Sequence, residues 1–136
     1  MKYADIKLGY ACNNHCIHCV IQNQKQRAEE VRGTSTRPTE ESKQEILKSY
    51  HTGCKAIVVT GGEPTIRSDF GEIIKYIKSL GILVSVQSNG RRFSDKMFVV
   101  ETAKYINVCV IALQGSTEFI HYRIPQVPGS LRLTVE

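Results

Sequence analysis

The sequence lacks the features that would place the protein in a membrane or outside the cell. No apolar run approaches the roughly 18 to 20 residues that a membrane-spanning helix needs. The first residues, Met1 to Asp5, contain no apolar segment of the kind found in a secretory signal peptide. These absences predict a cytoplasmic protein without a membrane partner.

Internal repeats, low-complexity tracts and basic clusters are missing as well. The formal net charge is +5, but the lysines and arginines are scattered, and Arg91-Arg92 is the single adjacent basic pair. Such a distribution indicates a solvated surface rather than a nucleic-acid site. The 136 residues, of which 41% are hydrophobic, suffice for one globular domain, residues 1–136.

What the sequence does contain is an alternation of apolar strands and amphipathic helices. Short β-branched runs such as Ala56–Thr60 are typical of parallel strands that are buried on both faces. A polar turn and a helical pattern follow each run, which predicts an α/β fold with a parallel sheet. Residues 22–37 have no apolar face, so we expect a loop there with one or two helical turns. The expected strands are 4–10, 56–60, 83–87 and 108–113, and the expected helices are 39–53, 68–81, 94–103 and one that opens at Gly129-Ser130.

The helical patterns also predict helix caps and buried side chains. Thr39 and Ser94 each precede an apolar pattern and are the expected N-caps. Isolated cysteines in apolar surroundings behave as small buried hydrophobes, which is the structural role expected of Cys54 and Cys109. The expected buried stripes are Ile46, Leu47 and Tyr50, then Phe70, Ile73, Ile74, Ile77 and Leu80, then Met97, Phe98 and Ala103.

Four unusual features each follow the carboxyl end of an expected strand. They are the cysteine cluster at residues 12–19, Gly-Gly-Glu-Pro at 61–64, Ser-Asn-Gly at 88–90 and Gln-Gly-Ser at 114–116. The carboxyl ends of parallel strands meet at one edge of a sheet, and that edge is where α/β folds bind ligands. The four features together therefore predict an enzyme.

Three of the five cysteines form the motif C-x3-C-x2-C, at Cys12, Cys16 and Cys19. Zinc sites usually combine two separated cysteine pairs, and no second pair is present, although His15 or His18 could complete a Cys3His zinc site. Three closely spaced thiolates suit a four-iron, four-sulfur (4Fe–4S) cluster with one iron left open to another ligand. The spacing favours the iron–sulfur cluster.

The cysteine triplet, followed some forty residues later by Gly61-Gly62-Glu63-Pro64, resembles the radical S-adenosylmethionine (SAM) superfamily. The resemblance implies a partial (β/α) barrel, with about four parallel strands present where most members have six. It also implies that Cys12, Cys16 and Cys19 bind a 4Fe–4S cluster whose fourth iron is chelated by the methionine part of SAM. In that family, reductive cleavage of SAM gives methionine and a 5′-deoxyadenosyl radical, which abstracts hydrogen from a substrate.

The same resemblance assigns cofactor-binding roles to residues at the other strand ends. The glycines would let SAM approach the backbone, and Glu63 would accept a hydrogen bond from the ammonium group of SAM. The alternative is that Gly61–Pro64 is a plain strand-to-helix turn without a role in binding. His18 would stack on the adenine of SAM; the alternatives are that it faces solvent or binds zinc. Ser88 and Asn89 would contact SAM, and the alternative there is a simple Asn-Gly turn. The expected SAM-binding residues are Gly61, Gly62, Glu63, Pro64, His18, Ser88, Asn89, Gln114 and Ser116.

The resemblance also sets expectations about partners and completeness. It implies a low-potential electron donor such as ferredoxin or flavodoxin, and a peptide or a cofactor precursor as substrate in preference to tRNA. Because two of the usual strands are missing, we expect the radical SAM core to be incomplete at the C-terminus. The 136-residue piece alone should then self-associate and be inactive. A non-catalytic zinc module and a degenerate domain that only binds a cluster are the rival interpretations.

Overall fold

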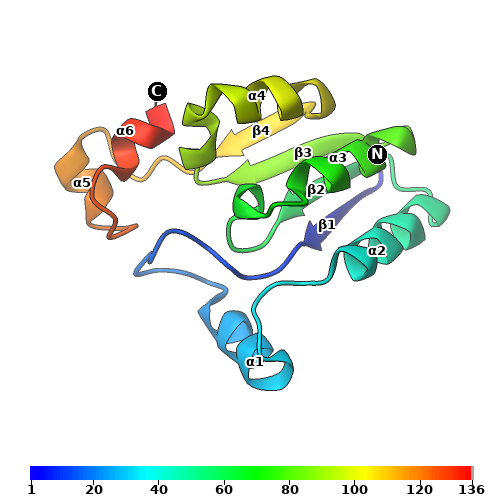
Figure 1. The fold of residues 1–136 in the computed structure, drawn as a ribbon, viewed down its shortest axis with the longest axis horizontal. Helices are drawn as coiled ribbons and strands as arrows, with labels where there is room; N and C mark the ends of the chain where they lie inside the picture. Colours follow the sequence, from blue (N-terminus) through cyan, green and yellow to red (C-terminus); the bar gives the residue numbers. More distant parts are fainter. Residues whose placement is uncertain (136) are drawn as a thin grey trace.

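The computed structural model describes residues 1–135 and confirms the α/β fold. One parallel sheet contains four strands in the order β1-β2-β3-β4. The strand arrows point the same way, and helices α5 and α6 lie at the arrowhead end (Figure 1). No helix in this part of the chain is long and apolar enough to cross a membrane. The strands are β1 (Tyr3–Lys7), β2 (Ala56–Thr60), β3 (Leu83–Ser88) and β4 (Val108–Ile111); the helices are α1 (Gln22–Arg32), α2 (Thr39–His51), α3 (Phe70–Ser79), α4 (Lys96–Thr102), α5 (Glu118–Tyr122) and α6 (Ser130–Val135), with 3-10 turns at Pro64–Ile66, Arg91–Ser94 and Ala103–Tyr105.

Helices α2, α3 and α4 cover one face of the sheet (Figure 1). Side chains of a strand alternate between its two faces. The side chains that point to this face and are fully buried are Ile6 of β1, Ile57 and Val59 of β2, and Val84 and Val86 of β3. The pairing of Ile6 with Val59, and of Val59 with Val86, lines these side chains up across the sheet. The core is completed by Ile46 from α2, Phe70, Ile73, Ile74 and Ile77 from α3, and Phe98 from α4.

The opposite face of the sheet is open and carries both polar and apolar side chains. Lys7 and Asp5 on β1 form an exposed ion pair with an Nζ–Oδ1 distance of 3.0 Å. Next to them, the Thr60 hydroxyl donates to the Gln87 side chain at 3.4 Å. A sheet with helices on one face and the other face open is consistent with the interior wall of a partial barrel.

Residues 22–32 form a regular helix, α1, where a loop with one or two helical turns is expected. The helix contains no buried residue, which explains why its sequence shows no apolar face. It extends away from the sheet (Figure 1) and ends at Gly33, which adopts the left-handed conformation typical of helix C-termini. The short helix α5 is likewise absent from the sequence-based expectations.

The apolar sequence of β4 predicts a buried strand, but in residues 1–135 β4 is an exposed edge strand, as expected of a sheet that lacks the fifth strand. Val108 and Val110 are 54% and 51% exposed, and Cys109 is exposed rather than a buried structural cysteine. Within residues 1–135, β4 pairs only with β3, so its far edge and much of its surface stay accessible. Cys54, in contrast, is buried as expected.

Two helix caps and several stripe positions also differ from expectation. Thr39 is the first helical residue after Pro38, and Asp95 rather than Ser94 caps α4 by accepting from two backbone amides. The stripe residues of α3 are correctly predicted, apart from Leu80, which is only partly buried. Four other expected stripe residues are exposed: Leu47 and Tyr50 on α2, Met97 on α4, and Ala103 in the 3-10 turn that follows α4.

Candidate functional site

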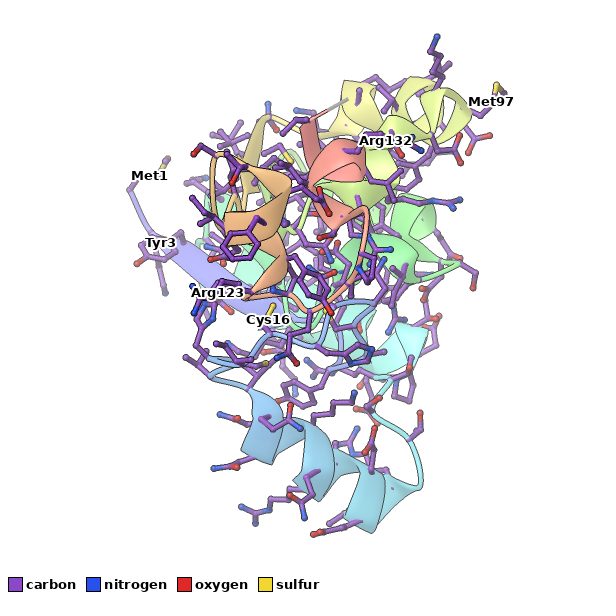
Figure 2. The ribbon with its side chains drawn as sticks, turned by 90° about the vertical axis from the view of Figure 1, so that its left-hand side faces the viewer. Met1, Tyr3, Cys16, Met97, Arg123 and Arg132 are labelled. Atoms are coloured by element: carbon purple, nitrogen blue, oxygen red, sulfur yellow. The ribbon has the colours of Figure 1, made fainter. Side chains whose placement is uncertain are left out.

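The three clustered cysteines lie in the segment between β1 and α1, which we call the cysteine loop (residues 8–21). Backbone hydrogen bonds fix this loop before the first cysteine and between the cysteines. Gly9 and Ala11 accept from the turn after β2, and the amides of His15 and Ile17 donate to Pro125 and Ile124, respectively. Figure 2 shows Cys16 below helix α5, on the side from which α1 extends. Cys12, Cys16 and Cys19 are partly exposed free thiols, so the loop presents three unpaired sulfur donors at the carboxyl edge of the sheet.

The electrostatics of the loop suit a site that receives a positively charged group. Burial raises the pKa of the Cys12 thiol, and the nearby Glu63 carboxylate and the other two cysteines act in the same direction, while a hydrogen bond from Asn14 opposes them. Burial and then the proximity of Cys19 raise the pKa of Cys16. Metal cations deprotonate thiols that they coordinate. The donor set, three soft sulfurs whose charges repel one another, therefore fits an iron–sulfur cluster.

The alternative of a single zinc ion is not favoured. A structural zinc needs four ligand atoms converging on one point, about 2.0–2.3 Å away. Among residues 1–135, no group of three or more His, Cys, Asp or Glu side chains is arranged to hold one metal ion. A 4Fe–4S cluster makes a different demand, because the three thiolates would each bind a different iron and need not converge on one point.

Gly61 and Gly62 form a close backbone contact with the cysteine loop. Gly62 donates to the Gly9 carbonyl at 3.0 Å, and the Glu63 amide donates to the Ala11 carbonyl at 2.8 Å. A Cβ atom on Gly61 would lie 2.2 Å from the Gly9 oxygen, and one on Gly62 would lie 2.2 Å from the Ala11 oxygen. The structure thus supplies a reason for both glycines that is independent of SAM, and their role toward SAM stays a prediction.

The Glu63 side chain is 2% exposed and is surrounded by donors. Its Oε1 atom accepts from the Thr65 amide at 3.1 Å, from the Thr65 hydroxyl at 2.6 Å and from the Ser88 hydroxyl at 2.9 Å. Its Oε2 atom accepts from the Asn89 amide at 2.6 Å. Glu63 therefore connects the turn after β2 to the turn after β3, and Pro64 begins the buried 3-10 turn beside it.

The turn after β3 reaches back to the cysteine loop. The Asn89 side chain donates to Asn13 Oδ1 at 2.7 Å, and the Arg91 guanidinium donates to the Asn13 carbonyl at 2.5 Å. Ser88 also accepts from the Gly90 amide. The structure thus brings together the cysteines, Glu63, Ser88 and Asn89, as the convergence of strand ends predicts.

The remaining candidate residues lie further from this network. His18 is exposed, and so is Ser116. Gln114 is partly buried, and its backbone amide donates to Nδ1 of the buried His121 at 3.4 Å. Their proposed contacts with adenine and ribose remain predictions.

Several residues that shape the site carry no motif in the sequence. Arg67 donates to the Leu8 carbonyl at 2.5 Å and to the Arg37 carbonyl at 2.8 Å, which ties the turn after β2 to the start of the cysteine loop. Asp69 pairs with this guanidinium and accepts from the Thr39 hydroxyl. No spacing rule reveals contacts between residues that are thirty or more positions apart. Asn13 and Arg91 were missed for the same reason.

Known proteins similar to this chain include a maturase, a heme synthase and the solved structure of Streptococcus suis SuiB. The mycofactocin maturase MftC of Mycolicibacterium smegmatis is 30% identical over 111 residues, which are 81% of this chain and 26% of that protein. The AdoMet-dependent heme synthase of Oleidesulfovibrio alaskensis is 31% identical over 124 residues, covering 88% of this chain and 30% of that protein. The structure of Streptococcus suis SuiB bound to precursor peptide SuiA matches with a TM-score of 0.75 at 19% identity, over 96% of this chain and 28% of SuiB.

These figures mean that the chain spans about 26–30% of the length of these relatives. The likeness to SuiB concerns the fold, and SuiB has also been solved bound to S-adenosylmethionine. The family model of the radical SAM superfamily matches residues 6–131, nearly the whole chain. The chain belongs to the radical SAM superfamily.

Proposed function

We propose that the full protein containing this chain is a radical SAM enzyme whose 4Fe–4S cluster is bound by Cys12, Cys16 and Cys19. Family membership supports SAM and an iron–sulfur cluster as its cofactors. The observation that carries the proposal is the arrangement of three free thiols in one loop, hydrogen-bonded to the turn that contains Gly61, Gly62 and Glu63. When bound, the reduced cluster supplies the electron that cleaves SAM to methionine and a 5′-deoxyadenosyl radical.

The chain's own residues would bind and orient SAM beside the cluster. In the part of the chain that the structure describes, Glu63 Oε1 accepts three hydrogen bonds and Oε2 accepts one. Oε2 therefore has the spare capacity to accept from the SAM ammonium group, which is a charge-assisted bond. The backbone amide of Asn89 donates to this oxygen and holds it in place.

The substrate that the names of the similar proteins suggest is a peptide. SuiB has been crystallised with a precursor peptide, and its fold is shared by this chain. A cofactor precursor is the second possibility within the same proposal, because one relative is a heme synthase. The electron donor would be a low-potential protein such as ferredoxin or flavodoxin, since sulfonium reduction requires a strongly negative potential.

The test is SAM cleavage by the full protein after anaerobic reconstitution with iron and sulfide. With dithionite and SAM, we expect 5′-deoxyadenosine and methionine in equal amounts by chromatography. Cys16→Ser should abolish both products, while the matched control Cys109→Ser, a partly accessible cysteine outside the loop, should keep them. An iron-loaded protein that binds a cluster but releases neither product would instead support a degenerate, non-catalytic domain.

A further inference from the structure

The Arg91 side chain contacts the cysteine loop directly from the turn after β3. Its Nη1 atom donates to the Asn13 carbonyl at 2.5 Å and to the Asn14 side-chain oxygen at 3.0 Å. The Asn14 amide in turn lies 3.4 Å from Cys12 Sγ, in hydrogen-bonding geometry. Arg91 is thus one residue removed from a sulfur that the proposed cluster would use.

Asn89 fixes Arg91 and the loop in a single arrangement. Its side-chain oxygen accepts from the Arg91 amide at 3.1 Å, while its side-chain nitrogen donates to Asn13 Oδ1 at 2.7 Å. The backbone of Asn89 is itself held on both sides, by Glu63 Oε2 at its amide and by the Thr134 hydroxyl at its carbonyl. The position of the guanidinium is therefore determined by several independent hydrogen bonds.

The charge of Arg91 is not neutralised by a carboxylate. Arg67 and Arg37 pair with Asp69 and Glu45, and the adjacent Arg92 pairs with Asp95 at 3.5 Å. Arg91 forms no ion pair with any carboxylate in residues 1–135. Its Nε atom is buried and has no hydrogen-bond partner there. A buried polar atom without a partner costs free energy, so the guanidinium's favourable contacts are those that Nη1 makes with the loop.

We propose that Arg91 is a positioning residue that holds the Cys12–Asn14 segment ready for the cluster and raises the cluster's reduction potential. The proposal rests on the proposed function, because it concerns the group that the cysteine loop would bind. Reduction adds one negative charge to a cluster that three thiolates already make anionic. A nearby cation that forms no ion pair favours the more negative state, and net charge and hydrogen bonds to sulfur are known determinants of cluster potentials.

The two parts of the role need different chemical properties of arginine. Nη1 alone donates to both acceptors of the loop, so positioning requires the rigid planar guanidinium that fixes this atom, whereas the effect on potential requires only the positive charge. Arg91→Lys keeps the charge and loses the rigid planar group. Arg91→Gln removes the charge. Arg92→Gln is the matched control. Arg92 is the neighbouring arginine, but it pairs with Asp95 and has no hydrogen bond to the loop in residues 1–135.

The test uses the full protein and two measurements. The first is the midpoint potential of the reconstituted cluster without SAM, by redox titration followed by electron paramagnetic resonance. The second is hydrogen exchange at the Asn14 and His15 amides in the iron-free protein. We expect Arg91→Gln to have a more negative midpoint potential and faster exchange, Arg91→Lys to have a potential close to that of the wild type with faster exchange, and Arg92→Gln to change neither.

A wild-type potential in Arg91→Gln would overturn the proposal, because a merely structural role alters exchange and not potential. Failure of the wild-type protein to take up iron would refute the proposed function. In that case the exchange measurement still decides about Arg91, since unchanged exchange in the iron-free Arg91→Gln protein would overturn its positioning role.

Discussion

Replacing Gly62 by alanine tests whether the turn after β2 exists to pack against the cysteine loop. The backbone of Gly62 does not lie in the left-handed region, so alanine is compatible with its conformation. The added Cβ, however, would lie 2.2 Å from the Ala11 oxygen and 2.6 Å from the Tyr10 oxygen. Both are backbone atoms, which cannot rotate away, so the two segments must separate.

The cost of this separation has two sources. Overpacking in a close contact typically costs about 1–3 kcal/mol. The amides of Gly62 and Glu63 would also lose their bonds to Gly9 and Ala11, at about 0.5–1.5 kcal/mol each. The free energy of unfolding should therefore fall by about 2–6 kcal/mol, a large part of the roughly 5–15 kcal/mol that stabilises a typical domain.

The assay is urea unfolding of the iron-free full protein, with Gly71→Ala as control. Gly71 lies in α3, and a Cβ there meets only Thr102 Cγ2 at 4.0 Å. Alanine favours helices over glycine, so Gly71→Ala should be neutral or stabilising by up to about 1 kcal/mol. Wild-type stability in Gly62→Ala, with only SAM binding reduced, would refute the packing argument and show that the glycine makes room for SAM.

Three further predictions address Glu63, Asp69 and the isolated cysteines. Glu63→Gln should weaken SAM binding by about 1.5–3 kcal/mol in calorimetry with unchanged iron content; equal affinity would leave Glu63 a purely structural role. Burial tends to raise the pKa of Asp69, but hydrogen bonds from Arg67 and Thr39 outweigh it and lower that pKa. Asp69→Asn should therefore destabilise the protein at neutral pH, and its deficit relative to wild type should shrink below about pH 4; a deficit constant with pH in urea unfolding would contradict this. A thiol reagent should modify the exposed Cys109 far faster than the buried Cys54, and equal rates would contradict the accessibility of β4.

The sheet could be predicted from the sequence because buried strands carry their own signal. Runs of β-branched residues such as Ala56–Thr60 coincide with observed strands. Helix α1 was missed because it buries no side chain, and without burial no periodic apolar pattern is selected. The burial of β4 was overestimated from its apolar sequence. Such a sequence indicates that a strand can be covered, but it does not say which segment covers it.

The site could be predicted in part, at the level of motifs. The cysteine spacing and the Gly-Gly-Glu-Pro turn identify the family, and strand-end placement brings Ser88 and Asn89 to Glu63 as observed. The bonds from Asn89 and Arg91 to Asn13 join positions 76 and 78 residues apart. Such contacts depend on the tertiary fold, so no local pattern reports them.

Iron content after anaerobic reconstitution of the full protein tests the central claim most directly. The account predicts about four irons per chain with the absorption of an iron–sulfur cluster. Cys12→Ala, Cys16→Ala and Cys19→Ala should each lose the cluster, whereas Cys54→Ala and Cys109→Ala should retain it. A protein that instead contains one stoichiometric, colourless zinc ion and takes up no iron would contradict the account.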